Sequence, residues 1–369
     1  MGKGPKMTDE HPYSVFCDDS QTETHQLKRV CIIVNPNSGG RKGLKVLERV
    51  KPILEEGGCT VKVLETKYAG HAKVLANEED LSEIDVFAPI GGDGTVHEVV
   101  NGFMSRKDYD QVKDSVTICI FPAGTGNTVA YDLKIGTPEK AAEIVLKGST
   151  RRIDVGVFDK SSSPQGGSAE IVSASDVKLE EESSPQPTPA PDGRLYWINI
   201  CGYALPTTVL KLANRLRFLG GAQYDLAAKQ ALFRNKGYKC KIEMIDAQDN
   251  EIVLEGKYSM VQAQITVHMG DRMAFTPHAK LDDGLMDLVL IEHRRVGKMI
   301  STMLAAQKNN GSHLEKKNVK SFQIKQLKVT PIAKNKMQGE STVNLDGELV
   351  GFSPFVASVA QKALRVVAE

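Results

Sequence analysis

The chain of 369 residues is 41% hydrophobic and 25% charged, a balance typical of a soluble globular protein. A chain of this length is expected to form two domains, because one ordinary core does not grow so large. Its 47 Lys and Arg residues face 46 Asp and Glu residues, and the net charge of +1 argues against bulk nucleic-acid binding. We therefore expect no nucleic acid as a partner.

The first folded segment alternates short apolar runs with segments of helical period. The strand-like runs cover residues 30–34, 61–64, 86–90, 116–121 and 153–158, and the helical segments cover residues 44–55, 72–76, 97–104, 128–133 and 139–146. This alternation predicts βαβ units and a mainly parallel sheet covered on both faces. We predict an α/β domain over residues 28–158, preceded by a disordered tail over residues 1–27.

Residues 159–192 break this pattern, since they are rich in Ser, Pro, Glu and Gln and poor in large apolar side chains. Such a segment cannot bury enough surface to offset the cost of ordering, so we predict a disordered insertion.

The remaining residues are strand-rich, with helical segments at about residues 209–232 and 296–307. They predict an antiparallel β-sandwich domain over residues 193–360. A last strand is expected over residues 361–369, with its return to the first domain as one alternative.

The most informative motif is Gly91-Gly92-Asp93-Gly94-Thr95, which directly follows an apolar run and precedes a helical segment. Glycines let the backbone bend sharply and approach phosphates, and the start of a helix offers free amides to the same anion. Asp93 is then the carboxylate available to accept a hydroxyl proton or to help bind Mg²⁺. The alternative is an Asp-Gly turn in which Asp93 only caps the helix.

Two further glycine-rich loops follow other strand-like runs, NPNSGGRKG at residues 35–43 and PAGTGN at residues 122–127. The ends of neighbouring parallel strands meet at one edge of a sheet, so the three loops are expected to converge on one crevice. A turn-only interpretation is open for each loop alone and weaker for the three together. Neither a GxxxxGK[ST] P-loop nor a GxGxxG fingerprint occurs in the chain.

The strings NPNSGGRKG, PIGGDGTVHEVVNGF and FPAGTGN, followed by LDDGLMDLVLI and NLDGELVG, resemble the diacylglycerol kinase and sphingosine kinase superfamily. The run HEVVNGFMSRKD is more similar to the sphingosine and long-chain-base kinase branch than to bacterial diacylglycerol kinases. The resemblance implies a nucleotide-binding α/β domain like that of NAD kinases, a β-sandwich that holds a lipid, and ATP with Mg²⁺ in the cleft between them. It implies transfer of the γ-phosphoryl group of ATP to a lipid hydroxyl.

The resemblance also implies roles for individual residues of the first domain. Asp93 matches the general base that accepts the proton of the lipid hydroxyl. The positions that match nucleotide-binding residues are Asn35, Ser38, Gly39, Gly40, Arg41, Thr66, Gly91, Gly92, Gly94, Thr95, Glu98, Gly124, Thr125, Gly126 and Asn127.

Four further positions match functional residues of the family. Arg217 and Glu348 match nucleotide-binding residues. Asp154 matches an acidic residue of a water network around Mg²⁺, although a solvated aspartate is an equal alternative. Asp283 lies in a segment that matches a second, structural cation loop of some bacterial relatives.

The lipid-binding segment departs from the sphingosine kinase pattern. An aspartate of that pattern is missing, and Thr207 or Thr208 lies near its place. A threonine can hydrogen-bond a hydroxyl group but cannot pair with an ammonium group. This departure favours a neutral lipid such as diacylglycerol or ceramide more than the motifs of the first domain do. The best candidate substrate is still a sphingoid base, and diacylglycerol and ceramide are the alternatives. Gln223 also replaces a basic residue of the family.

Two rival functions are an NAD kinase, which also uses a GGDGT loop, and an inactive scaffold that binds lipid and nucleotide. The stretch 209–233 is interpreted either as a lid over a lipid-tail pocket that touches the membrane or as an ordinary pair of amphipathic helices. His71 and His97 are interpreted as surface or loop histidines and Trp197 as a core residue.

The location of the protein is inferred from what the sequence lacks. The cysteines form no CxxC pair, and Cys31, Cys119 and Cys201 lie in apolar runs, which indicates a reducing compartment. No apolar run approaches the roughly 18 residues of a membrane helix, and no secretory signal is recognised. We expect a cytoplasmic enzyme with no transmembrane segment that meets its lipid at a membrane surface. The oligomeric state stays open, with a homodimer as one alternative.

Overall fold

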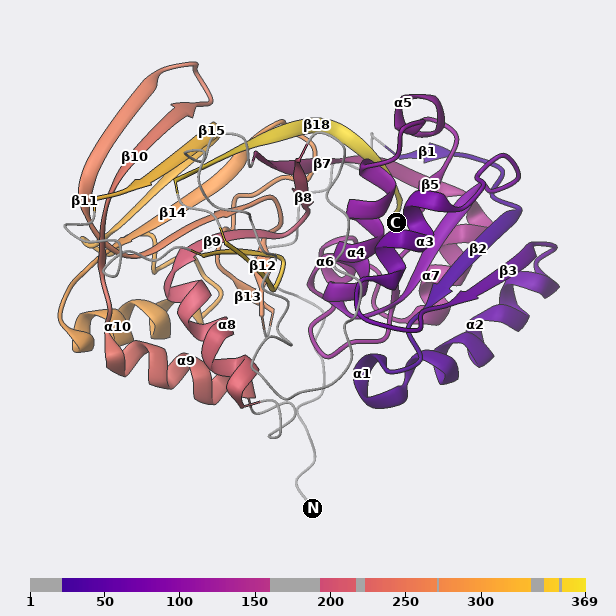
Figure 1. The fold of residues 1–369 in the computed structure, drawn as a ribbon, viewed down its shortest axis with the longest axis horizontal. Coiled ribbons are helices and arrows are strands. Elements are labelled where there is room, and N and C mark those ends of the chain that lie inside the picture. Colours follow the sequence, from indigo (N-terminus) through magenta and orange to yellow (C-terminus); the bar gives the residue numbers. More distant parts are fainter. Residues whose placement is uncertain (1–21, 160–192, 217–222, 271, 333–341, 352–353) are drawn as a thin grey trace.

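The structure is a computed structural model that describes residues 22–159, 193–216, 223–270, 272–332, 342–351 and 354–369. Two lobes lie side by side, an α/β lobe formed by the earlier part of the chain and a strand-rich lobe formed by the later part (Figure 1). This arrangement confirms the predicted fold class. The insertion predicted at 159–192 lies, beyond Asp159, outside the described residues.

The first lobe contains a parallel sheet whose strands are ordered β3-β2-β4-β5, with β6 continuing beside β4. Helices α2 and α7 pack together, as do α3 and α4. The strands are β2 (Arg29–Val34), β3 (Thr60–Glu65), β4 (Val86–Gly91), β5 (Thr117–Ile118) and β6 (Phe121–Pro122). The helices are α1 (Ser38–Arg41), α2 (Gly43–Glu56), α3 (His71–Glu78), α4 (Asp93–Met104), α5 (Tyr109–Val112), α6 (Thr128–Asp132) and α7 (Pro138–Lys147).

The sequences of the central strands explain this architecture. Every residue of β4 is buried, and so is every residue of β2 after Arg29. Continuous apolar runs of this kind belong to parallel strands that are covered on both faces. The loops that leave the carboxyl ends of β2, β4 and β6 are the three glycine-rich loops, so the sheet delivers them to one edge.

The second lobe is built mainly from antiparallel strands. They are β8 (Leu195–Trp197), β9 (Ile200–Ala204), β10 (Tyr238–Asp246), β11 (Glu251–Gln264), β12 (His268–Met269), β13 (Met273–Ala274), β14 (Met286–Glu292), β15 (Val319–Pro331), β16 (Val343–Leu345) and β17 (Glu348–Val350). Helices α8 (Leu205–Arg215), α9 (Gln223–Arg234) and α10 (Val296–Ala306) lie together on one side of this lobe (Figure 1). The helical stretch predicted at 209–232 is therefore two helices, α8 and α9.

Two long strands cross from one lobe to the other. Strands β7 (Ser149–Asp159) and β18 (Phe355–Val367) pair in antiparallel fashion along most of their length, and β18 also pairs with β15 and, in parallel, with β5 (Figure 1). Strand β18 begins before the predicted boundary at residue 360. A short strand β1 (Glu23–Thr24) pairs with β7, which corrects the predicted disordered tail at its last residues.

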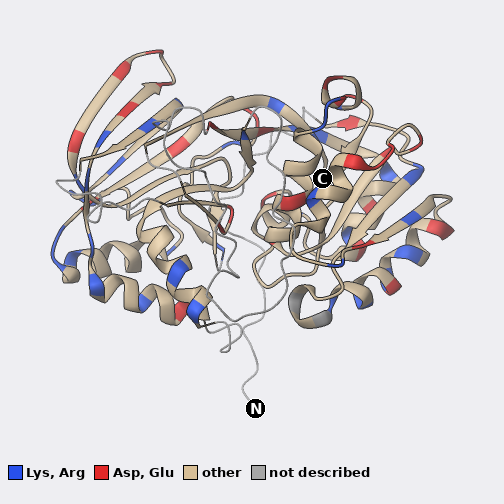
Figure 2. Cartoon of the chain, viewed as in Figure 1, with Lys and Arg blue, Asp and Glu red and all other residues tan. Residues whose placement is uncertain are grey.

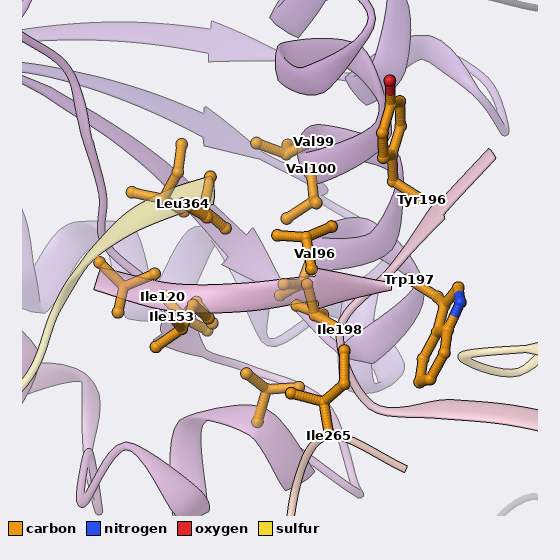
Figure 3. Close-up of a cluster of buried hydrophobic side chains, with 14 of the residues drawn as sticks. Val96, Val99, Val100, Ile120, Ile153, Tyr196, Trp197, Ile198, Ile265 and Leu364 are labelled. Atoms are coloured by element: carbon orange, nitrogen blue, oxygen red, sulfur yellow. The ribbon is translucent and has the colours of Figure 1, made fainter. Parts of the chain in front are cut away.

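The two lobes share a continuous hydrophobic core. Side chains from α4, β7, β8 and β18 meet in it, and Figure 3 shows Val96, Ile153, Trp197 and Leu364 among them. Trp197 is fully buried, which confirms its predicted place in the core. This shared core fixes the orientation of α4 relative to the second lobe, because interiors are close-packed.

Candidate active site

The three glycine-rich loops meet at the carboxyl ends of β2, β4 and β6. The amide of Asn35 donates to the carbonyl of Ile90 at 3.1 Å, and the amide of Ala123 donates to the carbonyl of Gly91 at 2.9 Å. A Cβ atom on Gly124 would lie 2.5 Å from the Cα of Gly92, so there is no room for a side chain at Gly124. The convergence of these loops is thus built on backbone contact.

The first loop is held by its asparagine. The side-chain oxygen of Asn35 accepts a hydrogen bond from the amide of Asn37 at 3.0 Å, and its carbonyl accepts from the amide of Ser38 at 3.1 Å. The side-chain nitrogen of Asn35 lies 3.4 Å from the hydroxyl oxygen of Thr95, which belongs to the second loop. Gly39, Gly40 and Arg41 belong to α1, and the side chain of Arg41 lies outside the described part of the chain.

Asp93 is the first residue of α4, and its carboxylate faces the third loop. One oxygen accepts a hydrogen bond from the amide of Asn127 and the other from the amide of Thr128, both at 3.0 Å. A Cβ atom on Gly126 would lie 2.5 Å from the first of these oxygens. Burial raises the pKa of Asp93 above its ordinary value, the amide of Thr128 opposes the shift, and the charge of Asp346 adds to it.

Asn127 shapes the third loop around itself. Its backbone is left-handed, with φ of 53°, and its side chain accepts from the amide of Gly124 at 2.9 Å and donates to the carbonyl of Gly124 at 2.8 Å. Asparagine tolerates this conformation better than most residues. Thr125 and Gly126 are exposed in this loop.

Glu98 lies one turn further along α4 and binds the start of α3. Its two carboxylate oxygens accept from the amides of Gly70 at 3.0 Å and Ala72 at 3.1 Å, which are free at the start of that helix. Burial raises the pKa of Glu98, and the charge of Glu348 acts in the same direction. A Cβ atom on Gly94 would lie 3.8 Å from a carboxylate oxygen of Glu348, which brings the second lobe to the start of α4.

A buried ion pair that we did not predict joins the lobes beside this point. The Nδ1 atom of His97 lies 3.1 Å from a carboxylate oxygen of Asp346, and that carboxylate also accepts from the amides of Ile198, Asn199 and Ile200. Burial lowers the pKa of His97, but the hydrogen bond to Asp346 and its charge outweigh burial and raise it. The interpretation of His97 as a surface or loop histidine is therefore wrong.

Two other polar contacts connect the lobes around the site. The side chain of Asn101 on α4 donates to the carbonyl of Tyr196 at 2.7 Å and accepts from its amide at 2.9 Å. Asp132, at the end of α6, hydrogen-bonds the ring of His268 and accepts from its backbone amide at 3.1 Å. Because α6 begins at Thr128, this second contact links the second lobe to the residues that hold Asp93.

The remaining predicted residues lie at the edge of the site or away from it. Thr66 follows β3, and its amide donates to the carbonyl of Val34 at 3.0 Å. The hydroxyls of Thr207 and Thr208, in α8, both donate to the carbonyl of Ala204, at 2.7 and 3.0 Å. Arg217 lies outside the described residues.

The two aspartates predicted to bind metal lie near each other in a different region. The carboxylate of Asp154 accepts from the amides of Gly284 at 2.6 Å and Lys362 at 2.7 Å, and burial raises its pKa to about 6. Asp283 accepts from the amide of Leu285 at 3.0 Å. In the part of the chain that the structure describes, no three His, Cys, Asp or Glu residues gather as a metal site. A metal role for either residue stays a prediction.

The two lobes match two parts of one known architecture. Residues 29–158 match the diacylglycerol kinase catalytic domain, and residues 202–368 match the YegS C-terminal NAD kinase beta sandwich-like domain. The chain thus pairs a diacylglycerol kinase catalytic domain with a YegS-type C-terminal domain, and its relatives include sphingosine kinases and diacylglycerol kinases.

Named relatives come from both branches. The chain is 22% identical to sphingosine kinase 1 of Arabidopsis thaliana over 91% of its own length and 71% of the relative, and 27% identical to the diacylglycerol kinase of Bacillus subtilis over 89% and 92%. It is 32% identical to sphingosine kinase B of Dictyostelium discoideum over 38% of its length, but it spans only 19% of that larger protein.

The fold is also that of a solved structure. A crystal structure of a diacylglycerol kinase from Bacillus anthracis superposes with a TM-score of 0.62 at 19% identity, covering 94% of this chain and 98% of the other.

Proposed function

We propose that the protein is an ATP-dependent lipid kinase that transfers the γ-phosphoryl group to a hydroxyl of a sphingoid base. The observation that carries this proposal is the meeting of three glycine-rich loops around the carboxylate of Asp93, next to the interface with the second lobe. Diacylglycerol and ceramide remain the alternative substrates, since the named relatives come from both branches.

The glycine-rich loops fit the phosphates of ATP. Side chains are sterically excluded at Gly91, where a Cβ atom would lie 2.4 Å from the side chain of Thr95, and between Gly92 and Gly124. Phosphate oxygens can therefore approach the backbone amides directly, as in other phosphate-binding loops. The predicted nucleotide residues of the three loops are proposed to act in this way.

Asp93 is proposed to act as the general base. It takes the proton of the lipid hydroxyl while the lipid oxygen bonds to the γ-phosphorus, and the bond from that phosphorus to the bridging oxygen of ADP breaks. Burial raises the pKa of Asp93, which makes the carboxylate a better base. The amides of Asn127 and Thr128 fix its orientation and leave lone pairs free for the incoming hydroxyl.

Mg²⁺ is compatible with the same site. This ion usually takes one or two protein carboxylates together with phosphate oxygens, so a preformed cluster of three ligands is not required. Asp93 and Glu348 are the carboxylates beside Gly94 and could hold it. The ion would neutralise charge on the transferred phosphoryl group.

The hydrocarbon part of the substrate is proposed to bind beneath α8, α9 and α10. A buried cluster there combines Met260, Phe275, Val289, Ile291, Met299, Ala306 and Val319 with Leu205, Leu232, Met269, Met273, Met303 and Leu314. Methionine side chains adapt to varied apolar shapes, which suits a site that opens for a lipid chain. This supports the lid interpretation of the helices.

The outer face of these helices is proposed to dock on an anionic membrane. Phe233 is 71% exposed, and Leu304 is 57% exposed. The described residues of 205–236 and 294–308 contain one acidic residue, Asp225, against Lys211, Arg215, Lys229, Arg234, Lys236, Arg294, Arg295, Lys298 and Lys308 (Figure 2). Exposed apolar side chains among cations fit a negatively charged bilayer surface. No described helix is long and apolar enough to span a bilayer.

The test is incubation with labelled ATP and Mg²⁺ and a panel of sphingosine, ceramide and diacylglycerol in mixed micelles, with NAD in a separate reaction. Asp93→Asn should lower turnover by ~10²–10⁴-fold. Asp110→Asn is the matched control, because the side chain of Asp110 is 86% exposed and pairs with Lys113, outside the three loops. Label in NAD alone would establish an NAD kinase, and ATP binding without label in any acceptor would establish a scaffold.

A further inference from the structure

Two buried glutamines lie beneath the helices, on the floor of the proposed lipid site. Met260, Gln262 and Gln264 alternate along β11 and point to the same face of the sheet, and Met260 belongs to the methionine-rich cluster described above. Gln262 pairs across the sheet with Val289, another member of that cluster. Both glutamines are 0% exposed. Burying an amide group in an apolar site costs free energy unless the amide is fully hydrogen-bonded, so the presence of these two glutamines requires an explanation.

The hydrogen bonds around these side chains fix the orientation of both amides. The Nε2 atom of Gln264 lies 3.4 Å from the carbonyl of Thr266 and 3.3 Å from the carbonyl of His268. Carbonyls only accept, so the nitrogen of Gln264 must face them and its oxygen must face Gln262. The Nε2 atom of Gln262 donates to that oxygen at 2.7 Å.

One atom is left over by this arrangement. The Oε1 atom of Gln262 is buried and has no hydrogen-bond partner among the described residues. Native proteins rarely leave a buried acceptor unpaired, because it loses its bonds to water without a replacement. The missing partner must be a donor, since the atom is a carbonyl oxygen.

The surroundings of Gln262 place this acceptor within the proposed lipid site. Its Nε2 atom lies 3.2 Å from the sulfur of Met269, a member of the methionine-rich cluster. On the other side, a chain of hydrogen bonds runs from Gln264 to the carbonyl of His268 and from His268 to Asp132. Asp132 ends α6, the helix whose first amide binds Asp93.

We propose that Gln262 is a specificity-determining residue that accepts a hydrogen bond from an N–H or O–H group of the lipid, other than the hydroxyl that reacts. Sphingoid bases and ceramides carry such donors beside the reacting hydroxyl. Diacylglycerol does not, because its two ester groups only accept. A nitrogen-bearing lipid can therefore donate a hydrogen bond to the Oε1 atom of Gln262, whereas diacylglycerol leaves that atom without a donor. This inference rests on the proposed function and decides between its alternative substrates.

The test compares sphinganine, ceramide and diacylglycerol in the same mixed micelles. For the wild-type protein, kcat/KM for the better nitrogen-bearing lipid should exceed that for diacylglycerol by about 10- to 100-fold, the range expected when a site built for a donor meets a lipid without one. In Gln262→Leu this ratio should fall toward about one. The ratio should fall because kcat/KM decreases for the nitrogen-bearing lipid and increases for diacylglycerol. Met269→Leu, an apolar exchange next to the amide of Gln262, should change kcat/KM for all three lipids by the same factor.

Two results would overturn the inference. One is a wild-type protein that prefers diacylglycerol, and the other is a folded Gln262→Leu variant that keeps the wild-type ratio. Gln262→Met provides a second, flexible apolar replacement if the leucine variant does not fold. If the wild-type protein phosphorylates no lipid, the proposed function fails by itself. Equilibrium binding of the same radiolabelled lipids then tests Gln262 separately, with the same ratio expected in the dissociation constants.

Discussion

The Nδ1 atom of His97 lies 3.1 Å from Oδ2 of Asp346, and the two residues come from different lobes. His97 is on α4, the helix that begins with Asp93, and Asp346 is on the hairpin that carries Glu348. The pair therefore ties the proposed base and a proposed nucleotide-binding residue of the other lobe into one buried unit. Breaking it should affect stability and the alignment of the two lobes together.

The first prediction concerns pH. Because the pKa of His97 is raised above 6.5, the folded protein favours the protonated ring. Its contribution to stability is thus complete below pH 6.5 and is lost as the pH rises through the folded-state pKa. The difference in free energy of unfolding between wild type and His97→Gln, measured by urea unfolding, should therefore shrink as the pH is raised above 6.5.

His293 is a control of opposite sign. Burial and the charges of Lys257 and Arg294 lower its pKa, so its contribution is present above the unfolded-state pKa and is lost as the pH falls. The difference in free energy of unfolding between wild type and His293→Gln should therefore grow as the pH rises. A difference for His97→Gln that does not change with pH would contradict the assigned ion pair.

The second prediction concerns Asp346. Its carboxylate accepts hydrogen bonds from three consecutive backbone amides in addition to its contact with His97, and its side chain is 3% exposed. Asp346→Asn removes the charge and should lower the free energy of unfolding by about 3 kcal/mol. Asp249→Asn, which disrupts an exposed pair with Lys325, should change it by less than about 1 kcal/mol. Equal effects of the two variants would refute a special role for the buried aspartate.

The third prediction tests the contact between the glycine-rich loops. In Gly124→Ala the new Cβ atom would lie 2.5 Å from Gly92 and 3.0 Å from the side-chain oxygen of Asn127, so the loops must separate. A displacement of about 1 Å at a reaction centre can cost about 100-fold in rate, and we expect a loss of that order in kcat/KM for ATP. Gly136→Ala meets no atom within 4 Å and should keep wild-type activity. Full activity of Gly124→Ala would show that the loops need not touch.

The sequence predicts features that depend on neighbouring residues. The loop around Asp93 is recognisable because an apolar run, the glycines and the helix follow one another directly in the chain. The two-lobe fold likewise follows from the alternation of strands and helices and from the later strand-rich pattern. The structure confirms the order of strand, loop and helix around Asp93, and the structure and the comparisons confirm the two-lobe fold.

Contacts between distant residues could not be predicted in this way. His97 and Asp346 are 249 positions apart, and nothing near His97 indicates that the second lobe buries it. Gln262 lies in a strand, where the pattern alone does not show which face packs against the helices. The prediction of one helical stretch at 209–232 also joined α8 and α9, although Gly220 and Gly221 stand between them and paired glycines are typical of turns.

The last prediction concerns the membrane-facing side of the helices. Phe233→Asp combined with Leu304→Asp replaces two exposed apolar side chains by charges of the same sign as an anionic bilayer. Burial of one large apolar side chain in a membrane contributes about 1.5–3 kcal/mol, so binding to phosphatidylcholine–phosphatidylserine vesicles in co-sedimentation should fall at least ~10-fold. Activity toward a substrate in detergent micelles should change far less.

Val253 supplies the matched control, because it is 57% exposed and lies near the start of β11. Figure 1 shows that the hairpin of β10 and β11 extends away from α9 and α10. Val253→Asp adds a comparable charge and should leave vesicle binding unchanged. Added salt should weaken the binding of the wild-type protein, since screening reduces the attraction between the cations and the anionic lipids. Unaltered vesicle binding by the double variant would place the docking surface elsewhere on the protein, while the kinase proposal, which is measured in micelles, would stand.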